Sequence, residues 1–256
     1  MGDNRLGPLP RTRRWSEVVD LVGAGASSAA VAAATLDAAD EVLSGAADDP
    51  TLARSFWLLT QIPDAARSPN FAKALQDLGL AVSDEPSASE LTAAFTEAVD
   101  REIDSRRART GPGELAQFAA VESLSALFRD QTSPLFGSSP DEVRLQLGKL
   151  GTPARFGQLA RSFFARFTER FLSYYISKEL PRHIGPGGRF SDLEEQKAFR
   201  EALATHCGQA ARIVEDFAGG WYSKARFEGE LSEARAPPLL AHPFKKIRGE
   251  LRRGSV

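Results

Sequence analysis

The stretch TPARFGQLARSFFARFTERFLSYYISKEL, residues 152–180, is the longest helix candidate in the chain. At 100° per residue, most of its aromatic side chains fall on one arc of a helix, namely Phe156, Phe163, Phe167, Phe171 and Tyr174. An aromatic face of this length must be covered by other elements, so the stretch predicts a central helix. On a neighbouring arc we expect a solvated flank made by Arg155, Arg166 and Arg170.

The remaining segments also have helical character. Asp, Ser or Pro marks many of the starts, and Gly or Pro marks the ends. Residues 87–107 show the pattern, because an apolar residue recurs at every fourth position in Leu91, Phe95, Val99 and Ile103. Strand signals are nearly absent. The sequence therefore predicts an all-α, multi-helix, bundle-like protein.

The length of the chain suggests two packed helical lobes. Single cores stop growing near about 250–300 residues, and this chain has 256. We expect a basic N-terminal tail at 1–14, an N-terminal lobe at 15–134 and a C-terminal lobe at 135–236. Residues 237–256 are expected to form a proline-containing linker followed by a basic segment.

Composition places the chain among ordinary folded proteins, with 42% hydrophobic and 26% charged residues. No stretch approaches the roughly 18–20 apolar residues of a membrane span. Near the N-terminus, basic residues precede an Ala/Val-rich run as in an export leader, but Glu17 and Asp20 interrupt that run. One cysteine excludes an internal disulfide and a multi-cysteine zinc site, which is typical of a reducing compartment. We expect a cytoplasmic protein.

Charge is unevenly distributed along the chain. The formal net charge is −2, yet residues 1–14 carry +3 and residues 243–256 carry +4. The segment between them, 15–242, therefore carries −9. An acidic body with two basic ends is the result.

The single cysteine, Cys207, stands beside one of the three histidines, His206. On a helix, Cys207 shares an apolar stripe with Phe199, Leu203 and Val214, whereas His206 points about 100° away. A thiol in apolar surroundings has a raised pKa, which is the opposite of an activated nucleophile. The sequence favours packing over catalysis for this pair.

Two glycine-rich segments are candidates for ligand binding. The first, VGAGASSA at 22–29, resembles the phosphate-binding turn of dinucleotide-binding folds, and its GAGAS resembles the opening of the sirtuin NAD loop. The residues on both sides follow helical spacing, and the Pro-Asp-Phe continuation of sirtuins is absent. This favours a turn between two helices, and we expect no cofactor.

The second segment, ELPRHIGPGGRFSDLEEQ at 179–196, places Arg182, His183 and Arg189 around glycines before a helix start. Cations beside a helix N-terminus can hold an anion, but the same glycines can simply turn the chain. Further on, Trp221 and Tyr222 follow two glycines and form either a partner-binding patch or part of the core.

The C-terminal segment is the third candidate. The prolines at 237, 238 and 243 predict an extended linker. The basic residues after it are Lys245, Lys246, Arg248, Arg252 and Arg253. Together with the apolar residues between them, these cations can form one short amphipathic helix, which needs a surface on which to fold. That surface is an acidic partner, nucleic acid, anionic lipid or the acidic body of the same chain.

No paired acid and base, metal motif or serine elbow stands out, so we expect no catalytic residue and no metal site. The leading hypothesis is a non-catalytic helical subunit or adaptor of a larger, bacterial-type assembly that acts through protein contacts. One alternative is a nucleic-acid-associated protein that uses its basic termini. Another is a nucleotide- or anion-binding protein or enzyme that uses the 182–189 loop.

Overall fold

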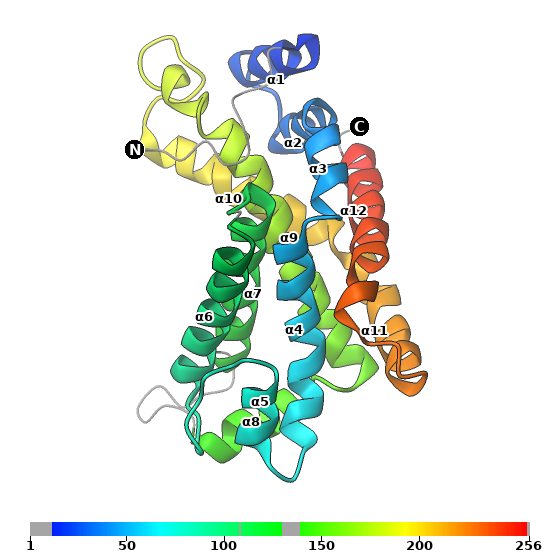
Figure 1. The fold of residues 1–256 in the computed structure, drawn as a ribbon. Coiled ribbons are helices and arrows are strands. Elements are labelled where there is room, and N and C mark those ends of the chain that lie inside the picture. Colours follow the sequence, from blue (N-terminus) through cyan, green and yellow to red (C-terminus); the bar gives the residue numbers. More distant parts are fainter. Residues whose placement is uncertain (1–11, 108, 130–138, 255–256) are drawn as a thin grey trace.

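The computed structural model describes residues 12–107, 109–129 and 139–254. These residues are predominantly α-helical, which confirms the predicted all-α, bundle-like fold (Figure 1). The α-helices are α1 Arg13–Gly23, α2 Ser28–Ala38, α3 Asp40–Ala46, α4 Pro50–Arg67, α5 Phe71–Asp77, α6 Ala88–Arg106, α7 Gly111–Arg129, α8 Pro140–Lys149, α9 Pro153–Ile176, α10 Leu193–Ala210, α11 Arg212–Phe227 and α12 Ala236–Arg253. Short 3-10 turns occupy Leu180–His183 and Glu233–Arg235. Within the described ranges, no helix combines the length and the apolar composition needed to cross a lipid bilayer.

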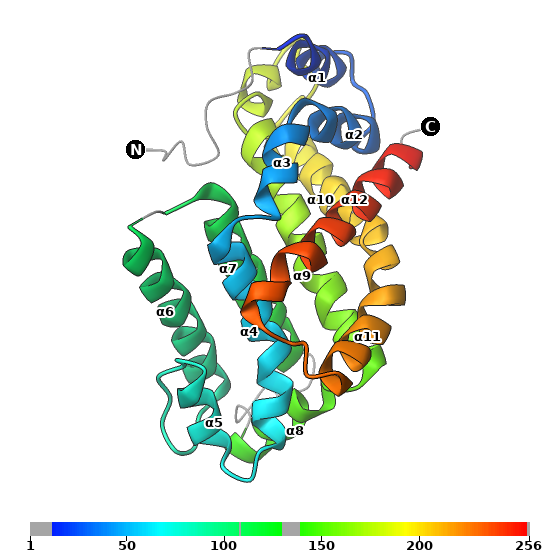
Figure 2. The same ribbon diagram turned by 45° about the vertical axis from the view of Figure 1, so that its right-hand side comes forward.

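Helix α9 is the central element, as its aromatic face predicts. α7, α10 and α11 pack around it (Figures 1 and 2). Its rings form a column in which the centroids of Phe163 and Phe167 lie 6.5 Å apart, and those of Phe167 and Phe171 lie 6.3 Å apart. The helix ends at Ile176 rather than at the predicted residue 180, because Pro181 cannot donate to the carbonyl of Ser177 four residues before it and its ring would clash with that carbonyl in a continued helix.

Close packing of α9 on α11 depends on two glycines. A Cβ atom at Gly157 would lie 2.7 Å from the backbone oxygen of Glu215, and one at Gly219 would lie 2.1 Å from that of Pro153. Neither position can therefore hold a larger residue without moving a helix. The close approach brings Phe156 and Tyr222 into a parallel stack with centroids 3.9 Å apart.

The C-terminal segment corrects the sequence-based expectation. The residues predicted as an extended linker belong to α12, which is continuous from Ala236 to Arg253. The prolines at 237 and 238 lie in the first turn of the helix, where the N–H groups have no intrahelical acceptor, whereas Pro243 lies inside the helix. Helix α12 is part of the core, since its apolar face is buried in Leu240, Phe244, Ile247 and Leu251.

The acidic body supplies the surface on which this segment folds. Arg248 of α12 pairs with Asp40, and Arg252 pairs with Asp37 through an Nε to Oδ1 contact of 2.8 Å. Phe244 packs on α9, where its ring centroid lies 5.0 Å from that of Phe167. Apolar burial thus holds the helix, and the two ion pairs fix it against the N-terminal helices.

The division into two lobes stays a prediction. Its boundary falls within residues 130–138, which lie outside the described residues, as does most of the predicted basic tail. Buried side chains from both sides of this boundary share one apolar cluster, which extends from Trp15 to Leu251.

The glycine contact between α9 and α11 gives a first prediction. Gly219→Ala should lower the free energy of unfolding by about 1–3 kcal/mol, because the added methyl group meets the backbone of Pro153. Gly220→Ala is the matched control, since nothing lies within 4 Å of its added Cβ. It should stabilise the helix by up to about 1 kcal/mol. Denaturant unfolding measures both, and equal effects at the two positions would refute the contact.

A second prediction concerns α12. Phe244→Ala should cost about 3–5 kcal/mol of unfolding free energy, because the ring is buried against α9. Lys246→Ala on the exposed face of the same helix should change stability by no more than about 0.5 kcal/mol. If both variants unfold like the wild type in a denaturant titration, α12 is not part of the core.

Candidate functional site

Cys207 and His206 are packing residues, as predicted. Cys207 is fully buried in α10, and this burial raises the pKa of its thiol to about 12. His206 faces a different element, because its ring lies against Gly254 at the end of α12. A thiol with so high a pKa is protonated at neutral pH and is no nucleophile.

The two glycine-rich segments pack on each other. The segment at 22–29 joins α1 to α2 through a turn in which Gly25 has a φ of 74°, which confirms the predicted turn between helices. The guanidinium of Arg189 crosses to this turn and donates to the backbone oxygens of Val22 (3.3 Å) and Ala26. Its Cζ also lies 4.5 Å from the ring centroid of Phe199.

The two arginines of the 182–189 loop therefore have partners within the chain. Arg182 pairs with Glu179 at 3.0 Å, and the Glu179 side chain is only 4% exposed. His183 lies 3.6 Å from the position that a Cβ of Gly23 would occupy. Anion binding at this loop stays a prediction, and Arg189 now has a structural role that the sequence does not reveal.

Of the two alternatives for Tyr222, the structure supports a place in the core. Its side chain is fully buried against Phe156, and burial raises the pKa of its hydroxyl group above the ordinary range of tyrosine. Trp221 is half-buried, with its ring centroid 6.5 Å from those of Phe56 and Phe156. Tyr222 therefore cannot contribute to a surface for a partner.

The five basic residues of the C-terminal segment separate into two groups. Arg248, Arg252 and Arg253 pair with carboxylates of the chain, the last with Glu250 at 3.0 Å. Lys245 and Lys246 are exposed, and the described part of the chain gives neither an ion-pair partner. These two lysines carry the available positive charge of α12.

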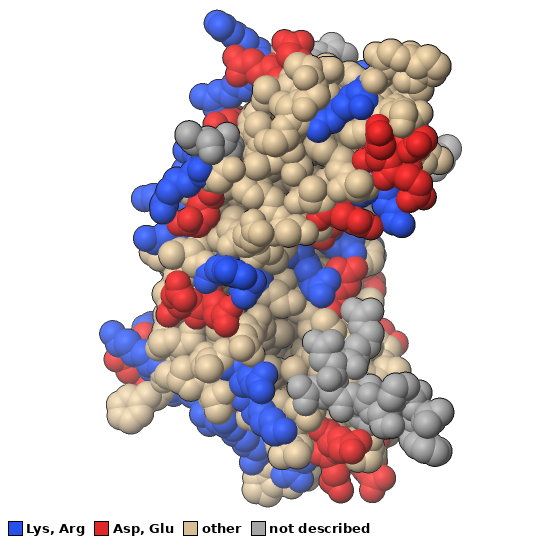
Figure 3. Space-filling view, turned by 180° about the vertical axis from the view of Figure 1, so that it is seen from behind, with Lys and Arg blue, Asp and Glu red and all other residues tan. Residues whose placement is uncertain are grey.

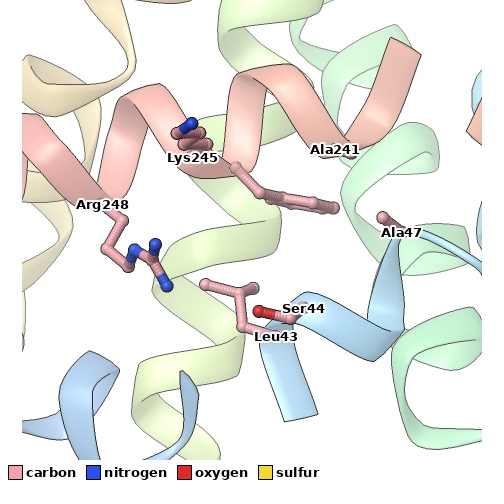
Figure 4. A pocket seen from close by; sticks show the side chains of 7 residues that line it. Leu43, Ser44, Ala47, Ala241, Lys245 and Arg248 are labelled. Atoms are coloured by element: carbon pink, nitrogen blue, oxygen red, sulfur yellow. The ribbon is translucent and has the colours of Figure 1, made fainter. Parts of the chain in front are cut away.

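A pocket lies between α3 and α12, beside these lysines. Its volume is about 190 Å³, and its floor is formed by the buried side chains of Leu43, Ala47 and Phe244. Figure 4 shows Leu43, Ser44 and Ala47 facing Ala241, Lys245 and Arg248 across it. We use the name α3–α12 surface for this pocket together with Lys246.

Sequence reasoning missed the α3 half of this surface. Leu43 and Phe244 are about 200 positions apart, and only the docking of α12 on α3 brings them together. A leucine followed by small residues at 43–47 is a weak signal that many helices share.

Basic and acidic side chains are interspersed over much of the face seen in Figure 3. The predicted solvated arginine flank of α9 is confirmed for the exposed Arg155. Arg166 and Arg170 are partly buried instead, because Arg166 lies 3.6 Å from Glu122 of α7 and Arg170 pairs with the same carboxylate. These pairs join α9 to α7.

Among the described residues, no three His, Cys, Asp or Glu side chains cluster so that they could hold a metal ion. The chain matches no protein-family model, no curated protein and no solved structure. The α3–α12 surface combines an apolar floor with two available lysines and is the candidate functional site.

Burial of Cys207 gives a pH prediction. In the unfolded chain the thiol ionises near pH 8.5, whereas in the folded protein it keeps its proton up to a pKa of about 12. The folded state then binds more protons than the unfolded state, so stability falls as pH rises through this window. Above about pH 9, the free energy of unfolding of the wild type should fall faster than that of Cys207→Ala, by up to about 1.4 kcal/mol per pH unit.

Denaturant titrations at a series of pH values measure this difference, and the shared tyrosines cancel between the two proteins. The native thiol should also resist labelling at neutral pH. Parallel pH profiles together with rapid labelling would show that Cys207 is accessible.

Proposed function

We propose that this protein is a non-catalytic helical subunit or adaptor that holds an acidic segment of a partner protein on the α3–α12 surface. The observation that carries the proposal is the apolar pocket between α3 and α12 with Lys245 at its edge and Lys246 beside it. An apolar anchor flanked by carboxylates is the complementary ligand.

The size of the pocket favours a side chain over a small molecule. Pockets for small ligands typically enclose about 300–1,000 Å³, and this one encloses about 190 Å³. A single leucine or phenylalanine of a partner fits that scale. The side chains at the floor of the pocket are held in place by packing, because Leu43 and Phe244 are each about 95% buried in the core. Anchors of this kind dominate the energy of many protein interfaces.

Charge favours an acidic segment. Lys245 and Lys246 have no carboxylate partner among the described residues, whereas Arg248 beside them is already neutralised by Asp40. Carboxylates of a partner would form ion pairs with the two lysines without breaking an existing ion pair. Such complementary charges mainly increase specificity and the association rate.

The same pairs weigh against nucleic acid as the ligand. Tight binding to a duplex uses several cations to neutralise phosphates. In α12, three of the five cations already pair within the chain, and residues 15–242 carry −9. The acidic protein segment therefore explains the surface better.

Site-specific photocrosslinking tests the proposal. A benzophenone amino acid replaces the exposed Ala241, which lines the pocket, in the full chain expressed in its own cells. Irradiation should attach one protein, and mass spectrometry should place the bond in a segment rich in Asp and Glu. The double variant Lys245→Glu, Lys246→Glu should lower this adduct roughly tenfold or more, with an unchanged melting temperature.

The matched control is Arg200→Glu, Arg212→Glu, which makes the same change in net charge at two exposed arginines of α10 and α11. It should leave the adduct intact. An adduct with nucleic acid, or equal loss in both double variants, would contradict the proposal.

A further inference from the structure

Leu145 of α8 is a large apolar side chain that is exposed to solvent. Val143 and Leu147 on the same helix are fully buried, whereas Leu145 is 58% exposed. Two positions along a helix correspond to about 200°, so Leu145 lies on the opposite face from both neighbours. A lone exposed leucine is ordinary, so its surroundings decide whether it has a role.

Those surroundings form an open groove of about 540 Å³ between α8 and the C-terminal end of α4. Leu145, Ala66 and Gly148 supply its largely apolar lining. We call this the α4–α8 groove. It lies at the far end of α4 from α3, as Figure 1 shows, and so is distinct from the α3–α12 surface.

Two arginines fix the walls of the groove by capping each other's helix. Arg67 at the end of α4 donates through Nε to the oxygen of Gly148 in α8 (3.1 Å). Arg144 of α8 donates to the oxygens of Ala66 (3.1 Å) and Ser68 (2.7 Å) at the end of α4. Both walls are therefore held in place before any ligand arrives.

These contacts also leave the groove positive. The acceptors are backbone oxygens at helix C-termini, each equivalent to about half a negative charge. Arg67, Arg144 and Lys149 line the groove against the single carboxylate of Asp141. Three cations against one carboxylate and two helix ends give a net positive charge beside an apolar floor.

We propose that the α4–α8 groove binds an acidic amphipathic helix of a partner protein, with apolar residues of that helix on Leu145 and its carboxylates facing the arginines and lysine. A groove between two helices suits a third helix laid along it. Its open shape suits this better than a small ligand, which needs enclosure. The inference goes beyond the proposed function, because it uses a different surface and predicts a second partner segment.

A synthetic helical peptide tests the inference on the full chain. Its leucines recur at i, i+3, i+4 and i+7 between glutamates, and a second peptide carries lysine at each glutamate position. Fluorescence anisotropy should show binding of the glutamate peptide and roughly tenfold or weaker binding of the lysine peptide. No binding of the glutamate peptide up to roughly 1 mM, or equal binding of both, overturns the inference.

Variants locate the binding. Leu145→Asp should weaken the glutamate peptide by roughly tenfold or more with an unchanged melting temperature. Leu193→Asp is the matched control, because that leucine is 68% exposed on α10, and it should have no effect. Lys245→Glu, Lys246→Glu should leave unchanged the part of peptide binding that Leu145→Asp removes, so this inference and the proposed function fail separately.

Two further measurements test other occupants. Sedimentation of the protein alone should show no self-association that depends on Leu145. Self-association that Leu145→Asp abolishes would mean that the groove holds a second copy of the chain, which overturns the inference. Vesicles containing phosphatidylserine should not compete with the peptide. Competition that depends on Leu145 would mean that the groove binds an anionic membrane, which overturns the inference.

Discussion

The close approach of α9 and α11 at Gly157 and Gly219 is the constraint on which the rest of the structure depends. With a side chain at either position the helices would separate, since the nearest atoms belong to backbone that cannot rotate away. The short separation allows Phe156 to stack on Tyr222, and this buries a large aromatic surface on both sides of the contact. The position of α11 in turn determines where the chain enters α12.

Apolar burial and ion pairs make different contributions to the docking of helix α12. The burial of Phe244 and its apolar neighbours supplies the larger free energy, because each buried side chain of this size contributes about 1.5–3 kcal/mol. The partly exposed pairs with Asp37 and Asp40 contribute less but fix the rotation and register of the helix. That rotation leaves Lys245 and Lys246 on the outside, beside the pocket above α3.

The sequence was sufficient to predict burial where the pattern of apolar residues lies within a single helix. The aromatic arc of α9 predicted the burial of its four phenylalanines, although Tyr174 is only half-buried and Tyr175 is buried instead. The apolar stripe around Cys207 is buried as predicted. Both patterns depend only on helical periodicity. The sequence failed for the proline-containing first part of α12, which was predicted as an extended linker, whereas the amphipathic helix predicted after it is present. It also could not predict Arg189 on the turn after α1, or the pocket between Leu43 and Phe244, because each joins residues more than 160 positions apart.

Helix α4 relates the two proposed binding surfaces to each other. Its 18 residues span about 27 Å, with α3 before its first turn and α8 packed at its last. Because α4 is continuous despite Pro63 and is largely buried, two partner segments would be held at a separation of that order rather than tethered flexibly. A rigid spacer raises the effective concentration of one segment near the other only when their own geometry matches the span. An adaptor with both proposed surfaces would therefore select pairs of segments by distance as well as by charge, unlike a protein that binds two acidic segments independently.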